Sequence, residues 1–359
     1  MDAVTNIRKK YILDLSVLKP GDIILEHGYK QHSLLIMKVT GSHYSHAMLY
    51  EGSTIIEATS SGGVFSKIPN RFAVVNEHDI KVLRLVNEIS PSEMEIITTT
   101  SRTLVGSSYS KSEVIRAGRK KKPRNEVVTG QFCSRLVAQC YNEGGIKLVD
   151  NVNYCSPADL ENSHHLLIKV DNAVKEATEE ELVHALAPTI HKKHKESTVQ
   201  WVKAAKKILM KSGVKAETIN DIYSATLNLK NPKVDKLILK AIKASGHYTF
   251  YLEDKVVNPF RYDVQKFENK VGLNLNEIDS EIHKEISIVK THSVNLNNAE
   301  KYFKAYPSCL MAAEVDLYKN ILGITNERLK VIVSHCETKG LAPTLLTTAL
   351  SMISYIGKI

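Results

Sequence analysis

The feature that most constrains the fold of this 359-residue chain is a change of pattern near residue 173. Before it, short β-rich runs alternate with turn signals, and two amphipathic helical patterns lie among them. After it, β-rich runs almost vanish and helical spacing prevails. Because the chain is too long for one small core, we predict two domains. These are an α+β domain over residues 1–172 and an all-α helical domain over residues 197–359, joined by a linker over residues 173–196.

Five β-rich runs outline the sheet of the first domain, and the short turns between them favour mainly antiparallel pairing. The first helical pattern follows Pro91, and the second ends at Gly144-Gly145. The predicted strands are Asp22–Glu26, His46–Tyr50, Thr54–Ala58, Ile80–Leu85 and Leu166–Val170, and the predicted helices are Ser92–Leu104 and Phe132–Glu143.

The second half of the chain predicts a bundle of six or seven helices. A capping-box pattern at Ser197–Gln200 marks the start of the first helix, and Asn231-Pro232 marks a later start. Further amphipathic stretches follow, at Ser280–Lys290, Asn298–Ala305, Ser308–Leu322 and Asn326–Cys336. The uncharged run Gly340–Gly357 is short for a membrane span and contains Pro343 and several hydroxyl side chains. We therefore predict a buried final helix there.

The net charge of +9 is concentrated in one segment. Six positive side chains lie between Arg116 and Arg124, and without them the excess is +3. A block of like charge is typical of a solvated loop. The alternative is a lid, with Arg119 and Lys121 among its cations, that attracts an acidic substrate or an anionic membrane. No zinc spacing, helix-turn-helix or interleaved aromatic pattern indicates sequence-specific nucleic-acid binding.

The five cysteines form an odd set with no CxxC pair, so neither a disulfide framework nor a zinc cluster is indicated. We predict reduced thiols, no cofactor and no metal. The N-terminus contains Asp14 within its short apolar stretch and no small-residue cleavage site follows. We therefore expect a cytoplasmic protein, or one that is exported without a Sec-type signal peptide.

Cys133 lies at the predicted start of an amphipathic helix. The unpaired N–H groups and positive end of a helix favour the thiolate, which is the nucleophile of acyl-transfer chemistry. The alternative is a half-buried structural cysteine.

A nucleophilic cysteine needs a base, and His46 opens a short strand directly after a turn. His43, three residues earlier, is the second candidate. Glu57 lies in the next predicted strand and would orient the imidazole; its alternative is an outward-facing strand position. A hairpin with Tyr50 near Thr54 would put Glu57 and His46 at the same end of the ladder.

Six ordered pieces of the first domain carry a family resemblance. The chain from Leu18 to Val170 resembles the circularly permuted branch of the NlpC-type papain-like cysteine hydrolases, the YiiX-like group. The resemblance implies a small antiparallel sheet with flanking helices, Cys133 as nucleophile, His46 as general base and acid, and Glu57 as the orienting residue. The chain departs from the pattern in its basic run and at Arg135, where an acidic residue is common. The pieces are Leu18–Leu25, Tyr44–Ala47, Ile55–Ala58, Gly106–Tyr109, Phe132–Val137 and Ser156-Pro157.

Three function classes follow. The first is a cysteine amidase or peptidase that acts on a peptide or peptidoglycan-type amide through an acyl-enzyme on Cys133. The second is an acyltransferase or thioesterase that uses the same three residues on an acyl-lipid substrate. The third is a non-catalytic binding module whose helical domain holds a protein partner. Tyr44 and Tyr109 are candidate substrate-binding residues near the cleft.

Overall fold

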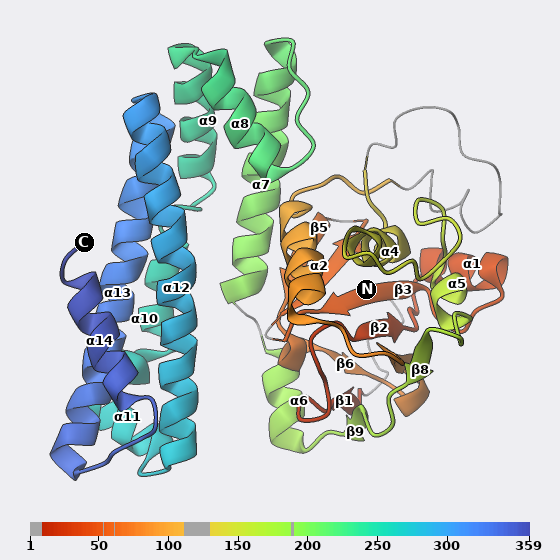
Figure 1. Ribbon diagram of the computed structural model, residues 1–359, viewed down its shortest axis with the longest axis horizontal. Helices are drawn as coiled ribbons and strands as arrows, with labels where there is room; N and C mark the ends of the chain where they lie inside the picture. The colour runs from red at the N-terminus through yellow and green to blue at the C-terminus, as the bar shows by residue number, and fades with distance from the viewer. Residues whose placement is uncertain (1–8, 53, 61, 111–129, 188–189) are drawn as a thin grey trace. The chain divides into compact units, whose positions relative to one another are not determined.

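The computed structural model describes residues 9–52, 54–60, 62–110, 130–187 and 190–359. The chain divides into two compact units, one that extends to residue 199 and includes 215–223, and one made of 200–214 and 224–359. The first unit holds the sheets and the second is helical (Figure 1).

The main sheet of the first unit has six strands, in the order β5-β4-β3-β2-β7-β8, and every neighbouring pair is antiparallel. The five predicted strands are all present in it, with bounds shifted by a residue or two, so the antiparallel α+β prediction is confirmed. The sixth strand, β5, was not predicted. The bounds are β2 (Ile23–Glu26), β3 (His46–Tyr50), β4 (Ile55–Thr59), β5 (Gly63–Lys67), β7 (Ile80–Leu85) and β8 (Leu167–Lys169).

The predicted register of the β3–β4 hairpin was wrong by one residue. Tyr50 pairs with Ile55 and Met48 pairs with Glu57. Thr54 belongs to the turn, because its carbonyl accepts a hydrogen bond from the N–H of Glu51. A shift of one residue moves side chains to the other face of a sheet. The observed register puts Glu57 on the face of Met48, and therefore on the face of His46, two residues earlier in β3.

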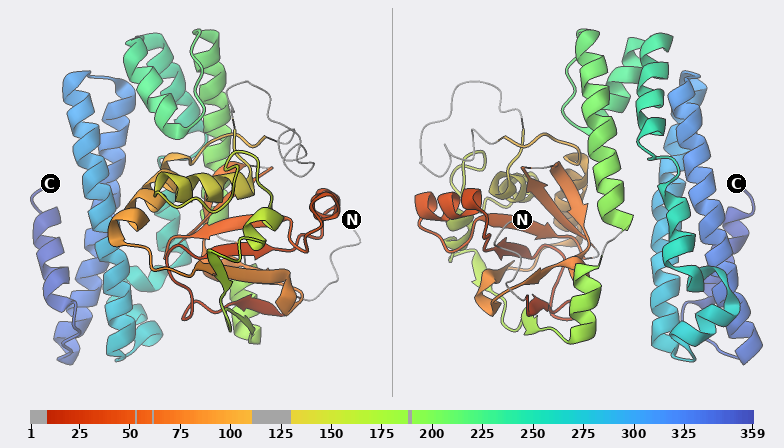
Figure 2. Two further views of the ribbon diagram at one scale, coloured as in Figure 1. Left: turned by 45° about the vertical axis from the view of Figure 1, so that its right-hand side comes forward. Right: turned by 180° about the vertical axis from the view of Figure 1, so that it is seen from behind.

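Helix α4 (Cys133–Glu143) covers the sheet near β3 and β4, next to α2 (Pro91–Thr103) (Figures 1 and 2). Its apolar positions Leu136, Val137 and Cys140 are fully buried in a core shared with the sheet. Burial of such a side chain contributes about 1.5–3 kcal/mol, so this stripe fixes α4 and with it the place of its first residue. Two further helices among the described residues of this region are α1 (Gln31–Thr40) and α5 (Pro157–Glu161).

The segment 173–196, expected to be a linker, contains a strand and parts of two helices among its described residues. Strand β9 (Val174–Glu176) pairs with β1 (Tyr11–Leu13), which also pairs with β6 (Ala73–Val74) in a second, three-stranded sheet. Helix α6 (Glu179–Leu186) then begins at Thr178, where Thr178 and Glu181 form a capping box. The capping box at Thr178 and the pairing of β9 with β1 therefore give this segment regular structure despite its polar composition.

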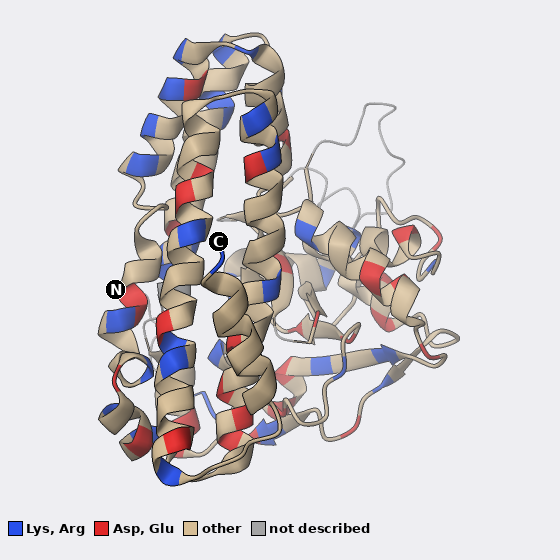
Figure 3. Cartoon of the chain, turned by 60° about the vertical axis from the view of Figure 1, so that its left-hand side comes forward, with Lys and Arg blue, Asp and Glu red and all other residues tan. Residues whose placement is uncertain are grey.

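The helical unit is built around two long helices, α12 and α13. Each joins two stretches that the sequence predicted as separate helices, because no proline interrupts them and Gly323 is accommodated inside α13. Basic and acidic residues are interspersed along the long helices (Figure 3). Helices α7 (Ile190–Lys211) and α8 (Ile219–Leu229) both cross the boundary between the two units. The other described helices of the helical unit are α9 (Pro232–Ala244), α10 (Asp254–Val257), α11 (Val264–Val271), α12 (Leu275–Ala305), α13 (Cys309–Lys339) and α14 (Leu346–Ile356).

The C-terminal run forms α14, which buries Ala349 and Ile356 in the core of the helical unit. This agrees with the predicted buried final helix. Within the described ranges, no helix combines the length and the apolar character that a membrane span needs.

A buried ion pair joins the two long helices. The guanidinium of Arg328 donates to the Glu285 carboxylate through Nε at 2.9 Å and Nη2 at 2.7 Å, and both side chains are almost fully buried. Burial raises the pKa of Glu285 even though Arg328 opposes this effect. Arg328 therefore offsets the cost of burying the Glu285 carboxylate, and its Nη1 also lies 3.3 Å from Oδ2 of Asp254.

We expect Arg328→Met to destabilise the chain by about 3–5 kcal/mol, because it leaves the Glu285 carboxylate buried without its partner. Chemical denaturation of the full chain, followed by circular dichroism, measures this. Lys339→Met is the matched control, since it breaks the more exposed pair with Glu268 and should cost about 0–1 kcal/mol. Equal costs for the two variants would contradict the importance of the buried pair.

Candidate active site

Cys133 is the first residue of α4. Phe132 before it has an extended backbone, with φ of −142° and ψ of 166°, and this turns the chain into the helix. The backbone N–H groups of Ala47 and Ser134 both donate to the sulfur. The first turn of a helix has N–H groups with no acceptor inside the helix, so it favours a negative charge at this place.

His46, the first residue of β3, lies between Cys133 and Glu57. Its Nε2 is 3.2 Å from Oε2 of Glu57, and its ring also makes a hydrogen bond with Cys133. Burial by itself disfavours the imidazolium, but the hydrogen bonds and charges of Cys133 and Glu57 outweigh it and raise the pKa of His46 to about 10. The structure therefore brings together the three residues that the sequence analysis selected.

Glu57 is a nearly buried carboxylate with three cationic neighbours. Its side chain is 9% exposed. Lys195 Nζ lies 3.2 Å from Oε1, and Lys67 Nζ lies 4.0 Å from Oε2, the oxygen that His46 uses. Burial would raise the pKa of Glu57, but Lys67, His46 and Lys195 together hold it far below the usual range. This carboxylate therefore stays charged beside His46.

Cys133 differs from the other four cysteines in its electrostatics. Burial would raise the pKa of its thiol, but the hydrogen bond and charge of His46 and the two backbone N–H groups lower it below the usual value. Burial raises the pKa of the other thiols instead, at Cys140, Cys155, Cys309 and Cys336. Since all five lie in the described ranges, Cys133 is the thiol most readily ionised.

The loop before Cys133 is held by a short parallel bridge between Tyr109 and Gln131. The N–H of Gln131 donates to the carbonyl of Ser108 at 2.7 Å, and the N–H of Ser110 donates back to the carbonyl of Gln131. Gly130 has a φ of +108°, and a Cβ there would lie 3.1 Å from the Ser108 carbonyl oxygen. Glycine is therefore needed at the point where this loop turns toward the helix.

Arg135, noted in the sequence as a departure from the family pattern, holds two loops together. It is fully buried, its Nε donates to the carbonyl of Asn153 and its Nη1 donates to the carbonyl of Gly130. Its guanidinium also lies over the ring of Phe132, 4.4 Å from the centroid. The residue thus fixes the chain on the N-terminal side of Cys133.

The two tyrosines predicted to bind substrate lie in different surroundings. Tyr109 is half-buried, and burial together with the charge of Cys133 raises its pKa, which places it beside the thiol. Tyr44 is buried and lines a cavity of about 220 Å³ with residues of β7 and the β8–β9 segment. Cys133 and His46 are not among the described residues that line this cavity. Arg119, Lys121 and the rest of the basic run fall outside the described residues.

Comparison with known proteins bears on the same part of the chain. Residues 17–164 match the model of a family described as "Permuted papain-like amidase enzyme, YaeF/YiiX, C92 family". This segment is a permuted papain-like domain of the C92 family. The chain thus combines a C92 domain, from a family of papain-like amidases and hence hydrolases, with a C-terminal helical region.

Among solved structures, one match is the crystal structure of metalloprotein YiiX from Escherichia coli O157:H7. It is 17% identical to this chain, covers 45% of this chain and 96% of its own, and has a TM-score of 0.32. No curated protein matches the chain.

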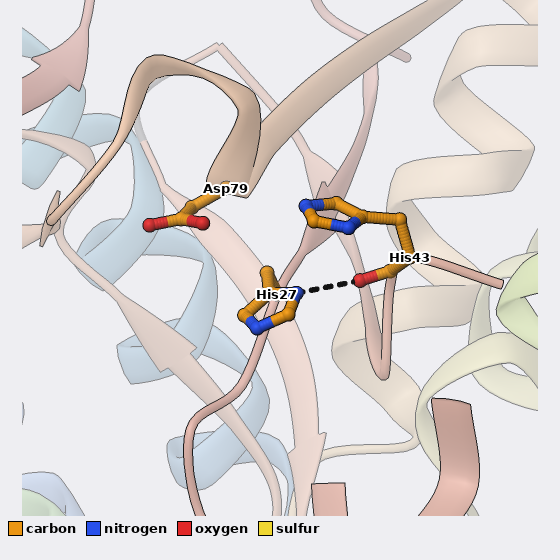
Figure 4. A group of neighbouring side chains, drawn as sticks. All are labelled: His27, His43 and Asp79. Carbon is orange, nitrogen blue, oxygen red and sulfur yellow. Dashed lines mark hydrogen bonds between the residues drawn. The ribbon is translucent and has the colours of Figure 1, made fainter. Parts of the chain in front are cut away.

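One group in the C92 domain has the residue types of a metal site. Ligand atoms of His27, His43 and Asp79 all lie within 4.8 Å of one another (Figure 4). Two of these three side chains also make hydrogen bonds: Nδ1 of His27 donates to the backbone carbonyl of His43 at 2.8 Å, and Asp79 accepts from Tyr29 and from the N–H of Asn76. Capping of the 3-10 turn Glu77–Asp79 is therefore enough to explain the carboxylate. His43 contacts this group, whereas His46 is the histidine that contacts Cys133.

The sequence analysis missed Lys67, Lys195 and the role of Arg135 in this site. Lys67 is the last residue of β5, a strand that was not predicted, and Lys195 belongs to a segment predicted to be a solvated linker. The short run Val64-Phe65 after the turn residues Gly62-Gly63 could have indicated this strand. For Lys195, 138 residues away in the chain, only the fold provides the contact.

We expect alkylation by iodoacetamide to be fastest at Cys133 and to persist at pH values below the usual thiol range. The lowered pKa of Cys133 means that its thiolate forms as the pH rises through a lower value, and is lost only below it. Rates measured from pH 5 to 10, with the modified cysteine located by mass spectrometry, check this.

His46→Ala should shift the onset of alkylation to higher pH, because burial then raises the pKa of Cys133 without opposition from the imidazolium. His78→Ala, in the 3-10 turn Glu77–Asp79, is the control and should leave the profile unchanged. If the pH profile of His46→Ala is the same as that of the wild type, His46 does not promote the ionisation of Cys133.

Proposed function

We propose that the C92 domain of this chain is a cysteine amidase or peptidase with Cys133 as nucleophile, His46 as general acid and base, and Glu57 as the residue that orients His46. The observation that carries the proposal is the single cysteine of lowered pKa, at a helix start, in contact with an imidazole that is itself hydrogen-bonded to a buried carboxylate. A nucleophile, a base and an orienting group in this order are what acyl transfer needs.

The use of the two ring nitrogens supports these roles. Nε2 of His46 faces Glu57, which leaves Nδ1 for the sulfur of Cys133. A carboxylate on one nitrogen fixes the tautomer and stabilises the imidazolium that forms when the other nitrogen takes the thiol proton. Glu57 remains charged throughout, because its three cationic neighbours keep its pKa low.

In the proposed reaction, the thiolate of Cys133 attacks the carbonyl carbon of an amide and a C–S bond forms. The C–N bond then breaks, and His46 gives its proton to the departing amine. Water then attacks the carbonyl carbon of the resulting thioester while His46 accepts a proton from this water. The C–S bond breaks, the carboxylic acid leaves, and the thiolate of Cys133 and the imidazolium of His46 are restored. We assign the backbone N–H of Cys133, in the first turn of α4, to the oxyanion of each tetrahedral intermediate.

The two other classes stay as alternatives to this proposal. The acyltransferase or thioesterase uses the same three residues and differs in its substrate, so binding to vesicles that contain anionic lipid, tested by flotation, distinguishes it. A binding module would need neither a lowered thiol pKa nor a paired imidazole, and the presence of both favours catalysis.

We expect Cys133→Ala to lower turnover by at least about 10³-fold while leaving the fold intact, because it removes the atom that forms the acyl-enzyme. The measurement compares the products that wild-type and variant protein release from a host lysate, by mass spectrometry, with circular dichroism as the test of folding. Cys309→Ala, in the helical unit, is the control and should retain full turnover. Products that persist in folded Cys133→Ala would exclude the proposed mechanism.

A further inference from the structure

A side chain from outside the C92 match reaches the active-site carboxylate. Lys195 lies in α7, beyond residue 164, where the family match ends. Its Nζ is 3.2 Å from Oε1 of Glu57, while Nε2 of His46 is 3.2 Å from Oε2. One oxygen of the Glu57 carboxylate thus contacts the imidazole of His46, and the other contacts the ammonium of Lys195.

The surroundings of Lys195 indicate a built contact. Its side chain is 22% exposed, and its ammonium lies 5.7 Å from the centroid of the Phe65 ring. At Gly62 a Cβ would lie 3.3 Å from Cε of Lys195 and 3.5 Å from Cγ2 of Val199, so glycine gives α7 a close approach to the β4–β5 turn. The end of the lysine stem therefore lies against the β4–β5 turn, and the ammonium contacts Glu57.

Several positively charged groups share the carboxylate of Glu57. His46 from β3, Lys67 from β5 and Lys195 from α7 all face this one carboxylate. On the other side of His46 lies Cys133, with Tyr109 beside it. Further out, Glu26 pairs with His46 across the β2–β3 ladder, and Lys9 lies near Glu26 and Lys67.

We propose that Lys195 is a positioning residue of the active site, which holds one oxygen of Glu57 and limits how strongly this carboxylate stabilises the imidazolium of His46. The physical reason is that an ammonium at 3.2 Å offsets part of the carboxylate charge that His46 experiences. The proposal rests on the proposed function, in which His46 has to give up its proton to the leaving group. An imidazolium held too strongly would donate that proton slowly.

The test is a titration of His46 in the full chain, in a Cys133→Ala background where the thiolate no longer holds the imidazolium. Protein labelled with ¹³C at histidine Cε1 is titrated by NMR, and the His46 signal is assigned by its absence in Cys133→Ala/His46→Ala. We expect Lys195→Met to raise the titration midpoint of His46 by about 0.5–1 pH unit, since removal of a nearby positive charge favours the imidazolium.

The controls separate this effect from a structural one. Lys195→Arg keeps a cation on Glu57 and should leave the midpoint within about 0.2 pH unit of the background value. Lys203→Met removes the same charge from an exposed position two turns further along α7 and should have no effect. Lys195→Gln serves as the second variant if circular dichroism shows that Lys195→Met does not fold.

A midpoint that stays unchanged or falls in folded Lys195→Met and Lys195→Gln would overturn the proposal. The titration uses no substrate, so this result is independent of whether the wild-type chain hydrolyses amides. Conversely, a chain with no amidase activity could still show the shift, which would leave the electrostatic role of Lys195 in place and refute the proposed function alone.

Discussion

The active-site geometry depends on one pairing register, that of β3 with β4. Met48 opposite Glu57 puts the carboxylate on the face of the sheet that also carries His46, and the 3.2 Å contact between them follows. In the register that the turn sequence suggested, Glu57 would point to the other face. A hydrogen bond from the N–H of Glu51 to the carbonyl of Thr54 closes the turn that accompanies the observed register.

The thiol is placed by a separate set of constraints. Burial of the apolar stripe of α4 fixes the helix, and its first residue, Cys133, then lies beside His46. The preceding loop is fixed twice, by the parallel bridge of Gln131 to Tyr109 and by Arg135, which ties Gly130 to Asn153. These contacts hold the loop that comes directly after residues 111–129, which lie outside the described residues. The cost of burying the Arg135 guanidinium is offset by its hydrogen bonds to loop carbonyls.

Within the first unit, residues beyond the family match also contact the C92 domain. Helix α7 begins in the first unit and continues in the second, and its Lys195 contacts Glu57. The three-stranded sheet likewise includes β9, which lies beyond the family match. The matched residues 17–164 therefore lack Lys195, one of the three cations that keep Glu57 ionised.

The sequence by itself determined the local elements and the residue types of the site. Alternating apolar residues and turn signals predicted five of the six main strands, and helix-start patterns predicted α2 and α4 with Cys133 at the start of α4. These features are set by neighbours within a few residues, which is why they can be read along the chain. Long-range packing determined the register that brings Glu57 to His46, the strand and helices in the described part of residues 173–196, and the approach of Lys195 across 138 positions of sequence. Contacts of this kind depend on packing between distant segments, for which local pattern and propensity carry no information.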